Sequence, residues 1–285
     1  MCDMIVETDI GNDPDDFFAL CYLISAGVNI RCILVSPGDP QQIAIVRFLC
    51  KELGLDIPIG SGKVDNYKHW NTGVHERLLN VYGAPLRSAP DDLGESLLPY
   101  VLNRHPKCEL FVIGPIKSIG KYLRTHPEAA FEKATMQGGF LPYSRYRPSI
   151  VKEKFEGREW APSFNPNGDR KGFLALVDAN IKEKRFVSKN LCHTVIYDRV
   201  IHESMGQPKD RASELFLEAM EIYLKKHPEK KFHDPCAAVC HLYPEVATWV
   251  KGKMVKMEGG WSTAPGNDLI AADLDYEAFW DHIRF

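Results

Sequence analysis

The chain has 285 residues, of which 45% are hydrophobic and 26% are charged, and its formal net charge at pH 7 is −3. This composition is typical of a globular protein that buries a substantial core without disulfide or metal support. A slightly negative chain lacks the basic face of nucleic-acid-binding proteins, so we expect no nucleic-acid partner.

Short apolar runs alternate with longer helical ones through the first half of the chain. We interpret as strands the runs Met4–Thr8, Ile30–Ser36, Ile57–Gly60 and Leu110–Ile113, with another strand reaching Thr135-Met136 before Gly138-Gly139. We interpret as helices the runs Asp15–Ala26, Gln41–Leu53, Leu97–Asn103 and Ile116–Arg124. This alternation predicts an α/β protein with a doubly wound, mainly parallel open sheet flanked by helices.

The remaining segments are less regular. Residues 61–95 and 140–168 are long and polar, and loops of this length are often lids or binding loops. The last third predicts helices at Ser213–Lys226 and after Asp234, and strands at Met254–Met257 and Leu269–Ala272. Because no linker-like stretch interrupts the chain, we expect residues 1–285 to form a single domain.

Several features bear on compartment and surface. The eight cysteines form no C-x-x-C pair, and most lie in apolar runs, which suits free thiols in a reducing compartment. No secretory signal and no run of 18 apolar residues is visible, so we expect a cytoplasmic protein without a membrane partner. The short basic stretches Lys225-Lys226 and Lys230-Lys231 are expected to be solvated helix ends.

The loop after the first strand is strongly acidic. It reads ETDIGNDPDD and contains Glu7, Asp9, Asp13, Asp15 and Asp16. In open parallel sheets, ligands bind beyond the carboxyl ends of the strands. Five carboxylates there repel one another, and a hard divalent cation relieves that repulsion. One or two acids would fit a capped helix start, with Asp13 or Asp15 as N-cap, but five do not, so we predict a metal site.

A second signal is Phe232-His233-Asp234-Pro235, which opens a predicted helix. Asp234 fits the N-cap of that helix, with Pro235 at its first position. Considered together with the acidic loop, Asp234 is also a candidate metal ligand, and His233 is a polar group beside it. Both interpretations of Asp234 stay open at this point.

Four motifs carry a family resemblance. The acidic loop, Gly114-Pro115, Phe164-Asn165 and His233-Asp234-Pro235 resemble, in the same order, the motifs of the inosine–uridine-preferring nucleoside hydrolases, over roughly residues 3–240. The resemblance implies calcium-dependent hydrolysis of the N-glycosidic bond of a small ribonucleoside, which releases nucleobase and ribose. It also implies a homodimer or homotetramer.

The resemblance implies a role for each matching residue. The expected Ca²⁺ ligands are Asp9, Asp16, Asp234 and the backbone carbonyl of Ile113. Asp9 is also expected to activate water, and His233 to lie near the leaving base. The expected substrate-binding residues are Asp15, Asp39, Asn165, Ser163 and His75, of which His75 matches only loosely. Trp160 is added as an aromatic residue of the 140–168 loop.

Some positions depart from the family pattern. Glu7 stands where Asp is usual, Asp13 belongs to a two-residue lengthening of the first loop, and Asp39 stands where Asn is frequent. Ser163 stands where a sugar-binding Glu is common. The aromatic residues Tyr143, Tyr146 and Trp160 could stack on a base or pack on the protein surface. From these departures we expect an unusual substrate, with a modified or salvaged purine ribonucleoside as the first choice.

The chemistry is consistent with the residues themselves. Breaking an N-ribosidic bond builds positive charge on the ribose; a metal lowers the pKa of water, and a carboxylate takes its proton. Two alternatives stay open. A metal-dependent phosphohydrolase would need an Asp where Glu7 stands and a phosphate-binding motif. A non-catalytic nucleoside-binding protein could use the same fold, although it would have little use for Asp9.

Overall fold

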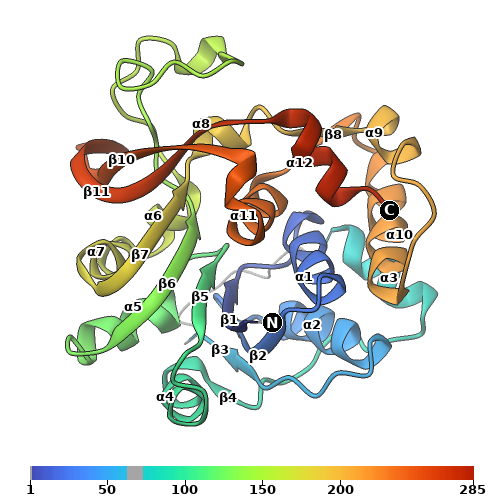
Figure 1. Ribbon diagram of the computed structural model, residues 1–285. Helices are drawn as coiled ribbons and strands as arrows, with labels where there is room; N and C mark the ends of the chain where they lie inside the picture. Colours follow the sequence, from blue (N-terminus) through green and yellow to red (C-terminus); the bar gives the residue numbers. More distant parts are fainter. Residues whose placement is uncertain (1, 63–72) are drawn as a thin grey trace.

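A nine-stranded sheet forms the centre of the computed structural model, which describes residues 2–62 and 73–285 (Figure 1). Its strands stand in the order β10-β11-β7-β6-β5-β1-β2-β3-β4. The strands, including the separate pair β8-β9, are β1 Asp3–Thr8, β2 Asn29–Val35, β3 Ile59–Ser61, β4 Asp92–Leu93, β5 Glu109–Val112, β6 Ala130–Gln137, β7 Asn180–Val187, β8 Ile196–Asp198, β9 Glu229–Lys231, β10 Ala247–Lys256 and β11 Trp261–Leu274.

The helices connect these strands. They are α1 Asp15–Ser25, α2 Pro40–Glu52, α3 Val74–Val81, α4 Gly94–Arg104, α5 Lys117–Thr125, α6 Phe164–Gly168, α7 Arg170–Asp178, α8 Lys189–Cys192, α9 Arg199–Glu203, α10 Arg211–Leu224, α11 His233–Leu242 and α12 Tyr276–Ile283, with the short 3-10 helices η1 Glu153–Phe155 and η2 Pro244–Val246. Among the described helices, none is long and apolar enough to span a membrane.

Helices cover both faces of the sheet (Figure 1). Side chains of β1 alternate between the two faces: Met4 and Val6 pack in a core that includes α1, α2, α10 and α11, whereas Ile5 packs in a core that includes α4, α5 and α7. This alternation follows from the two-residue period of a strand. A strand buried on both faces is continuously apolar, which is why Met4–Val6 could be recognised in the sequence.

The strand order reverses at β1. The chain runs from β1 through β2 and β3 to β4 on one side, and from β1 through β5, β6 and β7 on the other. Except for the antiparallel pair β10-β11, the neighbouring strands of the large sheet are parallel. The expected doubly wound, mainly parallel sheet is therefore confirmed, and its crossover point lies at the carboxyl ends of β1 and β5, where such sheets bind ligands.

Some sequence expectations were wrong in detail. The segment 61–95 was expected to be irregular; residues 63–72 of it lie outside the described part of the chain, and the rest contains α3, whose Val74, Leu78 and Leu79 are buried. Glu76 and Arg77 interrupt the apolar pattern, so the helix was missed. The strand β7 was also missed, because its first half is charged and only its last residues are buried on both faces.

The segment 140–168 was correctly expected to be a long loop with little regular structure. It projects from the sheet above β10 and β11 in Figure 1 and contains only the short helices η1 and α6. Its aromatic residues Tyr143 and Phe155 pack with Phe140 in a small separate core. The loop is thus held by its own side chains, as compact surface loops often are.

Candidate active site

A cavity of about 460 Å³ lies at the point where the strand order reverses. Its lining includes five aspartates from both ends of the chain: Asp9, Asp13, Asp15, Asp16 and Asp234. Asp9 follows β1 directly, and Asp15 and Asp16 are the first two residues of α1. The topology alone therefore brings the acidic loop to the ligand-binding edge of the sheet.

A close approach of two strand ends shapes this edge. A Cβ atom on Gly114 would lie 2.5 Å from the backbone nitrogen of Asp9 and 2.6 Å from the carbonyl carbon of Thr8. Only glycine fits there. The result is that Ile113, at the end of β5, lines the same cavity as Asp9 at the end of β1.

The aspartates of the loop do not cap α1. The N-cap position is Pro14, and no side chain accepts a hydrogen bond from the first turn. Asp16 instead accepts a 2.5 Å hydrogen bond from the hydroxyl of Thr8. The capping explanation for the acidic loop is therefore wrong, and the carboxylates remain available to the cavity.

Asp234 likewise does not cap its helix. α11 begins at His233, its N-cap is Phe232, and no side-chain cap is present. Asp234 is 5% exposed and turns into the cavity. Carboxylate oxygens of Asp15, Asp16 and Asp234 lie within 4.8 Å of one another. Of the two interpretations of Asp234, the structure supports the metal-ligand geometry.

Burial and mutual repulsion dominate the electrostatics of this cluster. Burial first, and then the charge of Asp15, raises the pKa of Asp16 to about 8. Burial and the neighbouring carboxylates also raise the pKa values of Asp9 and Asp234 well above the ordinary range. These three carboxyl groups line one cavity and resist ionisation, so a divalent cation would stabilise their charged forms.

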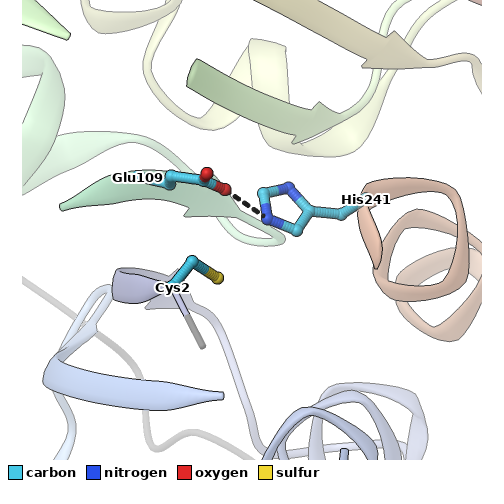
Figure 2. Close-up of side chains that lie close together, drawn as sticks. All are labelled: Cys2, Glu109 and His241. Carbon is cyan, nitrogen blue, oxygen red and sulfur yellow. Dashed lines mark ion pairs between the residues drawn. The ribbon is translucent and has the colours of Figure 1, made fainter. Parts of the chain in front are cut away.

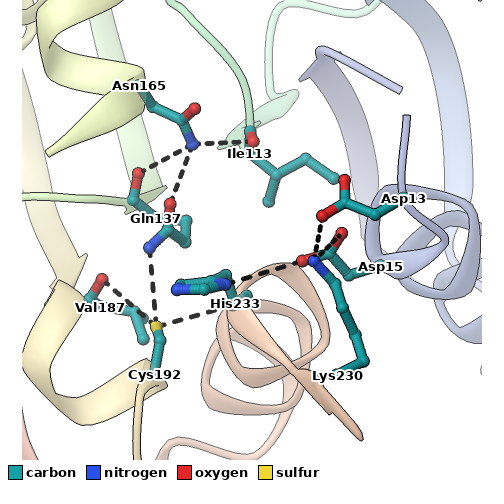
Figure 3. A network of polar contacts seen from close by, with 9 residues as sticks. All are labelled: Asp13, Asp15, Ile113, Gln137, Asn165, Val187, Cys192, Lys230 and His233. Atoms are coloured by element: carbon teal, nitrogen blue, oxygen red, sulfur yellow. Dashed lines mark hydrogen bonds and ion pairs between the residues drawn. The ribbon is translucent and has the colours of Figure 1, made fainter. Parts of the chain in front are cut away.

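The expected solvated position of Lys230 was wrong. Lys230 lies on β9, only 8% exposed, and its ammonium group pairs with Asp13 and, at 3.1 Å, with Asp15 (Figure 3). Burial raises the pKa of Asp15, but Lys230 and His233 outweigh it and hold that pKa at about 2. Asp15 is therefore ionised and already paired, unlike Asp9, Asp16 and Asp234.

A network of amide groups orients the Ile113 carbonyl. Asn165 Nδ2 donates to the Ile113 oxygen at 2.8 Å and to Gln137 Oε1 at 2.9 Å (Figure 3). Gln137 ends β6 and lines the cavity, but the sequence analysis did not single it out. Its position immediately before Gly138-Gly139, at a strand end, was the signal that could have identified it.

His233 stands between the acidic side of the cavity and a second histidine. Its Nδ1 atom lies 3.8 Å from Asp15 Oδ2, and its ring meets that of His193 edge-on with centroids 5.1 Å apart. His193 Nδ1 lies 2.8 Å from the ammonium group of Lys154. Burial, together with the charges of His233 and Lys154, lowers the pKa of His193 to about 2, so this ring is neutral.

Glu7 has a structural role that was not predicted from its position in the acidic loop. It is fully buried, and its carboxylate accepts hydrogen bonds from the Ser36 hydroxyl and from the backbone N–H groups of Ser118 and Ile119. It thereby binds the first turn of α5, where the helix dipole favours an anion. Burial nevertheless raises its pKa to about 7. Glu7 fixes α5 to β1 and does not line the cavity.

The other expected substrate residues fall into two groups. Ser163 and Asn165 line the cavity. Asp39 accepts a hydrogen bond from Gln41 N and caps α2, His75 Nδ1 lies 2.7 Å from the Gly11 carbonyl oxygen, and Trp160 is 39% exposed. Within the described residues these three do not line the cavity, and the aromatic side chain that does is Phe164.

A second cluster of titratable groups lies at the opposite, amino-terminal edge of the sheet (Figure 2). His241 Nε2 is 2.9 Å from Glu109 Oε2, and Cys2 lies beside them. Lys133 approaches the same Glu109 oxygen at 3.2 Å. Because this lysine already supplies the positive charge, we interpret the cluster as an ion-pair network that joins β5, β6 and α11.

Comparison with known proteins identifies a family for the whole chain. The family model "Inosine-uridine preferring nucleoside hydrolase" matches residues 4–281. An uncharacterized protein of Aquifex aeolicus (strain VF5) is 28% identical over 96% of this chain and 95% of its own length.

Solved structures share the fold. A plant nucleoside hydrolase, the PpNRh1 enzyme, superposes with a TM-score of 0.78 at 16% identity, covering 99% of this chain and 98% of the other. An inosine-guanosine nucleoside hydrolase gives 0.75 at 14% identity, covering 99% and 97%. The inosine-uridine preferring nucleoside hydrolase of Bacillus anthracis gives 0.74 at 15% identity, covering 99% and 98%.

Proposed function

Since the chain belongs to the inosine-uridine preferring nucleoside hydrolase family and is an N-ribosyl hydrolase, we propose that it cleaves ribonucleosides with Ca²⁺ as cofactor and Asp9 as general base. The observation that carries this proposal is the convergence of Asp9, Asp16, Asp234 and the Ile113 carbonyl on one cavity. Oxygen is the ligand atom that Ca²⁺ prefers. Asp15 is assigned to a ribose hydroxyl because Lys230 and His233 already hold its carboxylate.

When bound, the cation would hold a water and ribose hydroxyls and lower the pKa of that water. Asp9 would accept the proton of the water as it attacks the anomeric carbon. Asp9 follows β1 directly and lines the cavity, which places its carboxylate beside the proposed water. No covalent intermediate with the protein is required.

His233 is proposed to protonate the leaving base. It opens α11, lines the cavity and is 26% exposed, so a base can reach its ring from the open side. Its Nδ1 atom lies 3.8 Å from Asp15 Oδ2, so the ring stands between the acidic side of the cavity and the proposed position of the base. Asn165 and Ser163 are proposed to bind the sugar, while Asp39, His75 and Trp160 remain substrate-binding candidates that would need a change of conformation to contact the substrate.

The substrate that we propose in the first place is a modified or salvaged purine ribonucleoside. The support is that Ser163, a short neutral residue, lines the cavity where the family commonly has a Glu. The aromatic side chain available for stacking is Phe164, which is 67% exposed. Two of the similar structures are named for inosine hydrolysis, which makes inosine the natural reference substrate.

The alternatives are less well supported. A phosphohydrolase would use the carboxylate at position 7 as nucleophile, but Glu7 is buried against Ser118 and Ile119. A pure nucleoside-binding protein would have little use for a general base at Asp9, which lines the cavity. We also propose a homo-oligomer and a cytoplasmic location, the latter supported by eight free cysteines, seven of them buried.

The direct test is release of free base from a panel of common and modified ribonucleosides, followed by chromatography. We expect release in the presence of Ca²⁺ and its loss after treatment with a chelator, with recovery on adding Ca²⁺ back. Undiminished activity after complete removal of metal would refute the calcium proposal. Zinc bound with nitrogen or sulfur ligands in the purified protein would do the same.

A further inference from the structure

One side of the cavity carries positive rather than negative charge. Lys189, at the start of α8, and His193, just after it, line the cavity. Lys154 of η1 is bonded to His193. We call Lys154, Lys189 and His193 the basic wall. Asp9, Asp13, Asp15, Asp16 and Asp234 form the acidic wall, with His233 at the junction of the two.

The cations of the basic wall are held by neutral groups of the protein. Lys189 Nζ donates to the Pro162 carbonyl oxygen at 2.8 Å. Lys154 Nζ donates to His193 Nδ1 at 2.8 Å, which leaves the Nε2–H of the neutral His193 as a further donor. Among the described residues, no carboxylate lies within ion-pair distance of Lys154 or Lys189.

The surrounding charges are also positive. Burial, and then Lys231 and Lys189, lower the pKa of Lys154, and burial together with Arg158 lowers the pKa of Lys189. Lys231 itself pairs with Glu229. Like charges that lie close together without a counter-ion repel one another. A bound anion would reduce the repulsion among these cations, as a bound cation would reduce the repulsion among the carboxylates.

Because Ser163 is neutral, it gives the ammonium group of Lys189 no counter-charge. Ser163 Oγ accepts a hydrogen bond from Gly139 N, and the Gly139 carbonyl accepts one from the backbone nitrogen of Lys189. Ser163 and Lys189 are therefore neighbours across Gly139, and both line the cavity. The ammonium group of Lys189 donates to the carbonyl oxygen of Pro162, the residue before Ser163, so position 163 supplies no charge that offsets it.

We propose that the cavity accepts a ribosyl substrate that carries an anionic group, a phosphate monoester or a carboxylate, which Lys189 and Lys154 pair with while the ribose lies at the acidic wall. This inference rests on the proposed N-ribosyl hydrolase function and narrows its substrate class. A phosphate monoester carries about −1.5 to −2 charge and several acceptor oxygens, enough for both lysines and the His193 N–H.

The test compares ligands that differ only in the anionic group. Calorimetry in the presence of Ca²⁺ would measure ribose 5-phosphate against ribose, and orotate against uracil. We expect one anionic member to bind at least about tenfold more tightly than its neutral counterpart, since charge-assisted hydrogen bonds are the strong ones. Tighter binding of ribose 5-phosphate than of ribose would indicate that the anionic group is on the sugar. Tighter binding of orotate than of uracil would indicate that it is on the base.

Variants separate the basic wall from the metal. Lys189→Gln should remove most of the preference, and Lys154→Gln, at an exposed position, should reduce it without a risk to folding. Lys182→Gln is the matched control, because Lys182 is exposed and paired with Glu132. Equal binding of anionic and neutral ligands, or a preference that survives both the Lys189 and the Lys154 substitution, would overturn the inference.

Turnover distinguishes this inference from the proposed function. The kcat/KM values for inosine 5′-phosphate against inosine, and for orotidine against uridine, should follow the binding preference. If no base were released from any of the four, the proposed hydrolase substrate class would fail, and the binding ratios would still decide the inference. If neutral nucleosides were cleaved best and Lys189→Gln changed nothing, the inference alone would fail.

Discussion

The acidic and basic walls of the cavity differ in where their counter-charges come from. The aspartates of the acidic wall are mostly buried, and the protein supplies one buried cation of its own, Lys230, which pairs with Asp13 and Asp15. The lysines of the basic wall are at least partly exposed and pair with neutral groups. A buried charge is costly unless the protein supplies a counter-charge. A charge at the exposed rim of the cavity is solvated by water, so it can remain without a protein counter-charge until a ligand binds.

The largest expected effect is on the acidic wall. Asp9→Asn keeps an oxygen near the metal but removes the proton acceptor, so we expect kcat to fall by about 10²–10⁴-fold, the range typical of general bases. Asp56→Asn, at an exposed position between α2 and β3, is the control and should keep normal turnover. Wild-type turnover in the Asp9 variant would show that another group activates water.

The second prediction concerns the junction of the two walls. His233→Ala should slow inosine cleavage by about 10²-fold or more but affect an activated aryl riboside much less, because such a leaving group needs no proton. The measurement is kcat on both substrates. Equal losses on both would remove leaving-group protonation from the mechanism. A larger, substrate-selective loss in His193→Ala would move that role to the basic wall.

Lys230 offers a test of internal compensation. Lys230→Met should lower the free energy of unfolding of the calcium-free protein by about 3 kcal/mol, because it leaves the buried Asp15 without its cation. The pairing with Asp13 adds little to this figure, since that carboxylate is 42% exposed. Its neighbour Lys231→Met should change stability by only about 0.5 kcal/mol in urea unfolding. Equal effects would mean that Lys230 is not specifically coupled to the acidic wall.

The smallest expected effect is the pH dependence of calcium stabilisation. The pKa of Asp16 is raised to about 8, and those of Asp9 and Asp234 are also raised, so the folded state binds more protons than the unfolded state above pH 4. Without Ca²⁺, this contribution to stability is present below pH 4 and lost as pH rises toward 8. Asp15, with its lowered pKa, has the opposite sign but acts only below pH 4.

Calcium must displace those protons. At about a hundredfold excess over Kd it should add about 2.7 kcal/mol of stability, and the gain at a fixed Ca²⁺ concentration should shrink as pH falls from 8 to 5. Thermal unfolding with and without a chelator measures both quantities. A calcium gain independent of pH would show that the carboxylates are ionised before the metal binds.

The sequence predicted the carboxylates of the acidic wall better than the contacts that those and neighbouring carboxylates make across the fold. The acidic residues that follow the first strand form a local motif that is visible in the sequence. The His233-Asp234-Pro235 motif at a helix start identified Asp234 in the same way. The partners of Lys230 are distant in the chain, and the strand that buries it has three residues, too short for an apolar pattern. The same reason hid the contact of Glu7 with α5, which joins residues 111 positions apart. Chemistry carried by local motifs could be predicted, whereas pairing across the fold could not.

The assembly of the acidic wall from both ends of the chain has a kinetic consequence. Asp9, Asp15 and Asp16 are synthesised first, but Asp234 joins them only when α11 packs against α1. Contacts of such long sequence separation form slowly, because the loop-closure entropy precedes the gain in contacts. During folding, high-affinity calcium binding should therefore appear only after the docking of α11, so a calcium-sensitive signal would time that step directly.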